Sequence, residues 1–135
     1  MTQHVIIAGG GPAGLLTALG LAQAGTRVTV VEALDKLNDS PRALVYHHPV
    51  LPYLERLGLL EDCVKAGFTR QGFAWRIHSS EEMIYWSMDC LDDSTPHPYA
   101  LHLHQGLLSD IAAKHLERLP NAHIERSTRC VGCVE

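Results

Sequence analysis

The sequence predicts an α/β fold built on a Rossmann-like, doubly wound parallel sheet, of which this chain holds only a part. Two observations support this prediction. A strand, a glycine-rich turn, a helix and a second strand follow one another within residues 4–32, about the length of one parallel crossover unit. Further along, residues 68–104 change from helical to alternating spacing, which predicts the start of a second, mixed or antiparallel sheet.

The first crossover unit can be predicted element by element. Residues 4–8, HVIIA, are a short β-branched run that ends in glycines, as buried strands often do. The leucines that follow have helical spacing, and Pro12 suits a first helical turn. Gly25 stands where a glycine commonly ends a helix. Residues 27–32, RVTVVE, predict the second strand.

The remaining elements alternate between short helices and extended stretches. Residues 38–43 predict a loop, and leucine spacing predicts helices at 51–57 and 60–66, each followed by a glycine. The second half of the chain is predicted to contain a hairpin over 68–88 that turns at Ser79–Glu81, a linker at 92–98, a strand at 99–104, a helix from 108 to 119, and two last strands at 122–127 and 130–135.

Composition and charge exclude several classes of protein. The net charge is -4 with no basic cluster, so the electrostatic footprint of a nucleic-acid binder is absent. The run from Val5 to Thr26 carries no charged side chain for 22 positions, but its glycines and Pro12 would break a spanning helix. Residues 1–4 have no positive region of the kind that opens a secretion signal. We therefore expect no membrane span and a cytoplasmic location, where disulfides are rare.

The glycine-rich turn has the spacing of a phosphate-binding loop. Gly9, Gly11 and Gly14 form a G-x-G-x-x-G pattern, with Pro12 and Ala13 between the last two. The first glycine allows the tight turn, the second lets a pyrophosphate approach the backbone, and the third allows helix and strand to pack closely. The phosphates would lie on free N–H groups at the positive end of the helix.

An acidic residue completes this candidate nucleotide site. Glu32 ends the second strand, a few residues beyond the spacing of about 20 expected for a ribose-binding acid. A carboxylate there accepts hydrogen bonds from both ribose hydroxyls and repels a 2′-phosphate. We place Ala33, which follows it, in the same site. The alternative is a glycine-rich turn in an unrelated α/β protein with a solvated Glu32.

Three stretches resemble a known family. They are VIIAGGGPAGLLTALGLAQAGTRVTVVEA, SPRALVYHHPVLPYLERLGLLEDC and HLHQGLLSDIAAKHL. Together they are similar to the opening third of the FAD-dependent aromatic hydroxylases, the single-component flavoprotein monooxygenases typified by p-hydroxybenzoate and phenol hydroxylases. The family's second acidic motif and its Gly-Asp motif do not occur here, so we expect the chain to be the N-terminal part of a longer enzyme.

The resemblance implies roles for particular residues. Glu32 binds the adenosine ribose of FAD, Arg42 lies beside the flavin and pyrophosphate, and Gln105 reaches the ribityl chain. Arg42 could instead be a surface arginine, and Gln105 could merely cap its helix. His47 and His48 could face substrate, although surface or packing roles are the more ordinary alternative. No catalytic residue can be named.

The resemblance also implies an activity. NAD(P)H reduces FAD, and O₂ then gives a flavin hydroperoxide that hydroxylates a small, phenol-like aromatic substrate. The region 68–104 would begin a sheet that covers the substrate, and the complete enzyme could form a homodimer. Two alternatives are another FAD oxidoreductase, such as a halogenase or epoxidase, and a nucleotide-binding module without activity of its own.

The pair Cys130 and Cys133 has the CxxC spacing of metal sites but no second pair. Alternating apolar residues around it favour a strand, so no metal site is predicted.

Overall fold

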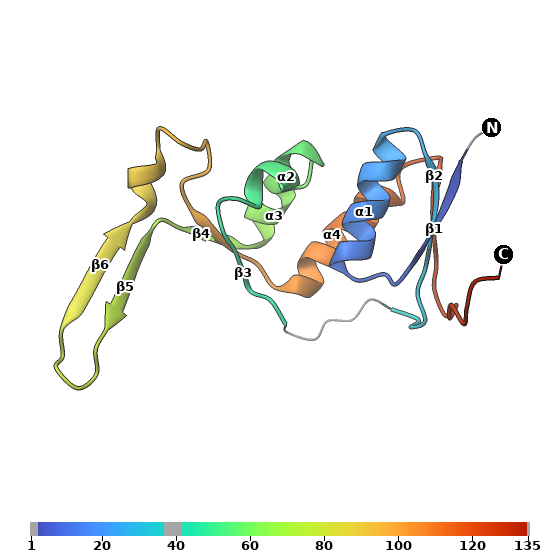
Figure 1. Cartoon of the computed structure of the whole chain (residues 1–135). Coiled ribbons are helices and arrows are strands. Elements are labelled where there is room, and N and C mark those ends of the chain that lie inside the picture. The colour runs from blue at the N-terminus through green and yellow to red at the C-terminus, as the bar shows by residue number, and fades with distance from the viewer. Residues whose placement is uncertain (1–2, 37–41, 135) are drawn as a thin grey trace.

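The computed structural model describes residues 3–36 and 42–134, which contain a parallel sheet, an antiparallel sheet and a separate two-stranded hairpin, with helices between the first two (Figure 1). The parallel sheet lies at one end of the molecule, beside the two longest of the described helices. An antiparallel sheet and a protruding hairpin lie toward the other end.

The parallel sheet has the strand order β1-β2-β8 and contains the predicted crossover unit. Strand β1 (His4–Ala8) leads through the glycine turn into α1 (Pro12–Gln23), and β2 (Arg27–Val31) returns in parallel with His4 opposite Arg27. Strand β8 (Ala122–Glu125) pairs with the other side of β2. These elements confirm the predicted α/β fold with a parallel sheet.

Helices α1 and α4 (Gln105–Leu116) pack against each other and against one face of this sheet. The apolar side chains that meet there are fully or almost fully buried, among them Leu15, Leu19, Val30, Leu108 and Leu116. Helix α1 leads into β2 and α4 leads into β8, and these two strands are parallel. The N-termini of both helices therefore lie at the carboxyl edge of the sheet, at the bottom of Figure 1.

The end of α1 is secured by a side chain from a distant part of the sequence. The Asn121 amide Nδ2 donates to the carbonyls of Ala22 and Thr26, both at 2.8 Å. Gly25 between them has φ 87°, a left-handed conformation that glycine adopts without strain. This confirms the predicted helix end.

The second sheet is antiparallel with the order β3-β7-β4. It contains β3 (Val45–Tyr46), β7 (Ala100–His102) and β4 (Phe68–Arg70). Sequence analysis missed β3, which is only two residues long. It also merged β4 with the hairpin, but Phe68 pairs with His102 of β7 instead.

The hairpin consists of β5 (Gly72–Arg76) and β6 (Met83–Ser87), which pair only with each other. Its turn includes Ser79–Glu81 as predicted, and Glu81 has φ 58°. A short 3-10 helix, η1 (Met88–Leu91), follows. The predicted linker at 92–98 is not a loose connection: His97 is buried, and its Nε2 lies 3.0 Å from Oε2 of Glu55, on the short helix that begins at Leu51.

The two short helices have nearly the predicted bounds. They are α2 (Leu51–Arg56) and α3 (Leu60–Ala66). Leu51, Leu54 and Cys63 are buried and continue the core from the α1–α4 layer toward the antiparallel sheet. One predicted strand is wrong. Residues 130–134 are irregular, and Val131 and Val134 are 92% and 96% exposed, because no strand among the described residues lies beside them to pair with.

Candidate functional site

The glycine turn at the carboxyl end of β1 is shaped by contacts that only glycine permits. Gly9 has φ 108° and donates its N–H to the Val31 carbonyl at 2.8 Å. A Cβ on Gly14 would overlap the Gly9 carbonyl oxygen. Gly9 and Gly14 therefore have the predicted turn and packing roles.

A Cβ on Gly11 would meet no atom within 4 Å, as would a Cβ on Gly9, but Gly11 does not have the positive φ of Gly9. It is the N-cap of α1, with φ -74° and ψ 175°, and no side chain caps the helix. In the part of the chain that the structure describes, no acceptor is bonded to the N–H of Ala13 or Gly14. The open space and the free N–H groups form a suitable place for a pyrophosphate.

Glu32 reaches from the end of β2 into this turn. Its Oε2 accepts the Gly10 N–H at 2.6 Å, and its Oε1 accepts the Leu34 N–H at 2.9 Å. A Cβ on Gly10 would lie 3.1 Å from Oε2, so a larger residue would push the carboxylate away. Sequence analysis missed Gly10, although the unbroken Gly-Gly-Gly run was a visible signal.

The same hydrogen bonds keep Glu32 ionised. The backbone N–H groups of Leu34 and Gly10 hold the pKa of the carboxyl below its usual range, against the opposing effect of burial. Each oxygen still has a free lone pair, since a carboxylate accepts at about four positions. Glu32 can therefore bind a diol while it continues to hold the turn.

The segments that carry Arg42 and Gln105 lie side by side although 63 positions separate the two residues in the sequence (105 − 42). The Gln105 N–H donates to the Ala43 carbonyl at 3.1 Å, and the Leu103 N–H donates to the Leu44 carbonyl at 2.9 Å. Arg42 is exposed, and Gln105 is the first residue of α4. The N-cap of α4 is His104, whose Nδ1 accepts the Gly106 N–H. Gln105 is thus not the cap, which removes the simpler alternative for it.

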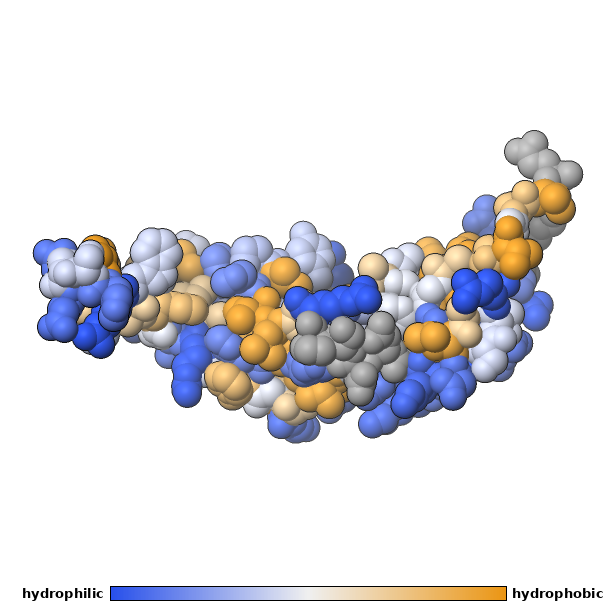
Figure 2. All heavy atoms as spheres, turned by 90° about the horizontal axis from the view of Figure 1, so that it is seen from below, coloured by the Kyte–Doolittle hydropathy of each residue, from blue (hydrophilic) through white to orange (hydrophobic). Residues whose placement is uncertain are grey.

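The predicted site residues lie at one edge of the molecule. The glycine turn, Glu32 and Ala33 lie where β1 and β2 end, and the start of α4 lies beside the start of α1. Figure 2 views the molecule from this side, where hydrophobic side chains reach the surface over its middle and at the sheet end. His47 and His48 follow β3, and His48 is partly buried. Residues 38–41 of the predicted loop lie outside the described residues.

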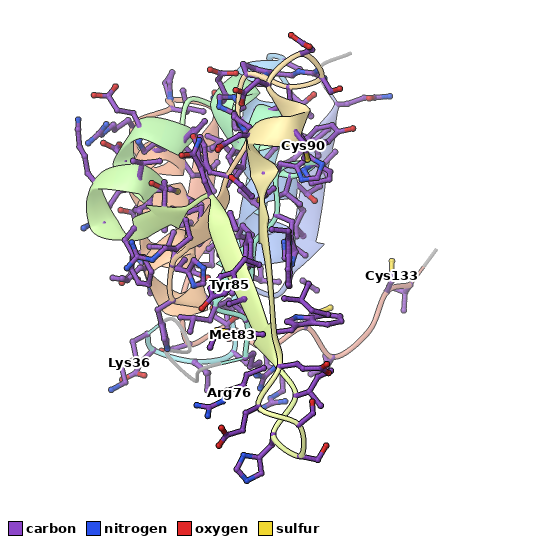
Figure 3. The ribbon with its side chains drawn as sticks, turned by 90° about the vertical axis from the view of Figure 1, so that its left-hand side faces the viewer. Lys36, Arg76, Met83, Tyr85, Cys90 and Cys133 are labelled. Atoms are coloured by element: carbon purple, nitrogen blue, oxygen red, sulfur yellow. The ribbon has the colours of Figure 1, made fainter. Side chains whose placement is uncertain are left out.

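No metal site emerges from the described residues, among which no three His, Cys, Asp or Glu side chains gather. Cys130 and Cys133 are free and exposed in the C-terminal tail, where Figure 3 shows Cys133 pointing away from the ribbon. Among residues 3–36 and 42–134, no helix is long and apolar enough to cross a membrane.

A parallel sheet, a glycine turn at a helix N-terminus and an acid at the end of the second strand define a dinucleotide-binding α/β domain. The comparison with family models identifies the cofactor. Residues 2–135 match the family described as FAD binding domain, and the chain belongs to this family.

Two curated proteins that are similar to this chain are monooxygenases. The chain is 60% identical over 133 residues to the 6-hydroxy-3-succinoylpyridine 3-monooxygenase of Pseudomonas putida, covering 98% of this chain and 34% of that protein. It is 42% identical over 128 residues to the para-nitrophenol 4-monooxygenase of a Pseudomonas species, covering 93% and 31%. The chain thus spans about a third of the length of these curated relatives.

A solved structure supports the fold. The crystal structure of p-nitrophenol 4-monooxygenase from Pseudomonas putida superposes with a TM-score of 0.90 at 36% identity, covering 98% of this chain and 34% of that one. The resemblance to FAD-dependent aromatic monooxygenases is confirmed by these matches, and FAD is the cofactor of the family.

Proposed function

We propose that this chain forms the nucleotide end of the FAD site in an NAD(P)H-dependent monooxygenase that hydroxylates a phenol-like ring. The observation that supports it most directly is the double contact of Glu32 with Gly10 and Leu34. This contact holds a carboxylate beside an open helix N-terminus, where an adenosine ribose and a pyrophosphate would lie next to each other. Glu32 would accept the ribose hydroxyls, and the N–H groups of Ala13 and Gly14 would bind the pyrophosphate.

Arg42 and Gln105 are proposed to extend the site toward the flavin. The support is the backbone pairing of Ala43 with Gln105, which places the two residues on adjacent segments. Arg42 would lie against phosphate or flavin, and Gln105 would reach the ribityl chain. When bound, FAD supplies the redox chemistry, in which two electrons from NAD(P)H allow one oxygen atom of O₂ to enter the ring and the other to leave as water.

The names of the two relatives narrow the substrate class. In both, the ring carbon that receives oxygen lies para to a ring hydroxyl and carries a substituent, succinoyl in one and nitro in the other. We therefore propose a small six-membered aromatic ring with a hydroxyl group para to the site of attack. The hairpin region, residues 68–104, is proposed to begin the sheet that covers this ring.

The proposal is tested on the complete protein encoded by the gene. A yellow protein whose spectrum is that of bound FAD, with FAD retained and FMN not, supports a site that includes the adenosine end. NAD(P)H oxidation that depends on 4-nitrophenol or 6-hydroxy-3-succinoylpyridine tests the activity. A colourless protein without affinity for added FAD would refute the cofactor assignment, and FAD binding without turnover would favour a module with no activity of its own.

Cell fractionation tests the predicted cytoplasmic location, and sedimentation tests the predicted homodimer.

A further inference from the structure

The segment that follows β8 lies against the loop that carries Glu32. The Glu32 N–H donates to the Glu125 carbonyl at 2.8 Å, which extends the pairing of β2 and β8 by one residue. The chain then turns back, so that the Thr128 N–H donates to the Glu32 carbonyl at 2.8 Å and the Ser127 N–H donates to the Leu34 carbonyl at 3.0 Å. Three backbone hydrogen bonds thus hold residues 32–34 from one side.

The turn in this segment requires an unusual backbone conformation. Ser127 has φ 55°, in the left-handed region that non-glycine residues seldom adopt. Two contacts support it. Thr128 Oγ1 donates to the Arg126 carbonyl at 3.1 Å, and the Arg126 guanidinium lies 3.0 Å from Oε1 of Glu117, the residue that caps the C-terminus of α4. The segment is therefore tied to α4 on one side and to the Glu32 loop on the other.

Leu34 connects this segment to the nucleotide site. Its carbonyl accepts the Ser127 N–H, while its own N–H donates to Glu32 Oε1. The other carboxylate oxygen holds Gly10. We infer that Ser127 is a positioning residue for FAD: its left-handed turn fixes Leu34, Leu34 fixes the Glu32 carboxylate, and the carboxylate fixes the glycine turn. This inference rests on the proposed function, since it concerns the same FAD site.

Ser127→Val keeps the N–H group but strongly disfavours a positive φ. A smaller fraction of molecules would then have Glu32 in place, and the apparent Kd rises by the inverse of that fraction. We expect FAD binding to the complete protein to weaken about tenfold. Ser127→Gly accommodates the same φ without strain, so its Kd should stay within about twofold of wild type.

Glu81 provides a matched control. It has φ 58° in the hairpin turn, far from the parallel sheet in Figure 1. Glu81→Val introduces the same kind of backbone strain and should lower the melting temperature in the way that Ser127→Val does. Its FAD Kd should equal that of wild type, which separates a general loss of stability from a loss of positioning.

A double-mutant cycle gives the sharpest test. If Ser127 acts through the Glu32 carboxylate, the two changes are not additive. Ser127→Val in a Glu32→Gln background should then alter the FAD Kd by less than about twofold. Equal FAD affinity of wild type and Ser127→Val, or an undiminished tenfold effect in the Glu32→Gln background, would overturn the inference. Absence of FAD binding by the wild-type protein would instead overturn the proposed function.

Discussion

At Glu32, one side chain contacts two neighbouring backbone segments. Oε2 holds Gly10 and Oε1 holds Leu34, so the residue stabilises the turn before any ligand binds. A glutamine has one acceptor oxygen, and its NH₂ group would face an N–H donor. The substitution therefore disturbs both the turn and the ribose contact.

We expect Glu32→Gln to weaken FAD binding about ten- to a hundredfold, since a hydrogen bond to a charged group contributes about 1.5–3 kcal/mol. The fold should persist because the buried core of α1 and α4 does not involve Glu32. Titration of the apoprotein with FAD measures the effect, and circular dichroism checks the fold. An unchanged Kd would show that Glu32 does not contact the cofactor.

The lowered pKa of Glu32 also predicts a pH dependence of stability. A carboxyl whose pKa is lower in the folded than in the unfolded state stabilises the fold above its unfolded value, about 4.3 for glutamate. That contribution is lost as the pH falls through the lowered folded value. The difference in unfolding free energy between wild type and Glu32→Gln should be constant near neutral pH and narrow below about pH 4. Urea unfolding over this range tests it, and a gap that widens in acid would contradict it.

Arg42 is exposed, so its effect should be on the flavin and not on stability. Arg42→Lys keeps the charge but loses the planar fork, and the two side chains are not equivalent at a phosphate or stacked site. We expect reduced flavin retention and slower NAD(P)H-driven reduction at an unchanged melting temperature. Wild-type values of both flavin properties would remove Arg42 from the site.

Among the elements, the glycine turn contains two glycines that have different surroundings. A Cβ on Gly14 would overlap the Gly9 carbonyl oxygen, whereas a Cβ on Gly11 would meet no atom within 4 Å. The dihedral angles of Gly11 are also open to alanine. One glycine therefore serves the packing of α1 on β1, and the other leaves space for a ligand.

We expect Gly14→Ala to lower the stability of the protein and its FAD affinity together. Gly11→Ala should abolish FAD binding while the apoprotein unfolds near the wild-type temperature, because the added methyl group occupies only ligand space. Thermal unfolding of the two apoproteins and FAD titration distinguish the cases. A Gly11→Ala protein with wild-type affinity would show that the pyrophosphate does not approach that position.

At the scale of the whole molecule, the exposed apolar surfaces and an unpaired strand edge favour association between chains. Strand β1 pairs only with β2 among the described residues, and Ile6 on it is 65% exposed. The hairpin is apolar on both faces: Trp75 is 69% exposed, and Tyr85, on the side with Arg76 and Met83 in Figure 3, is 71% exposed. Unpaired strand edges and large apolar patches are templates for association.

We therefore expect residues 1–135 expressed alone to be oligomeric or poorly soluble, to retain little flavin and to show no hydroxylase turnover. Size-exclusion chromatography and the visible spectrum test this expectation. A soluble, yellow monomer would contradict it, and would mean that these residues form a self-sufficient flavin domain.

The sequence by itself determined the crossover unit, because its signals are local. Helical spacing, a proline at the helix start and glycines at positive φ each depend on a few neighbouring residues, and α1, α3, β1 and β2 have almost the bounds that these signals predict. The glycine turn and its acid were visible for the same reason.

Only the tertiary structure decided the contacts between distant segments. The two-residue strand β3 exists because β7 pairs with it, and the apolar alternation at 130–134 forms no strand because no partner strand lies beside it in the part of the chain that the structure describes. No local sequence pattern indicated that Ala43 pairs with Gln105. The same holds for the hydrogen bonds of Ser127 and Thr128 to the Glu32 loop. Backbone hydrogen bonds between strands and loops do not depend on side-chain identity, so the residues that make them carry little trace in the sequence.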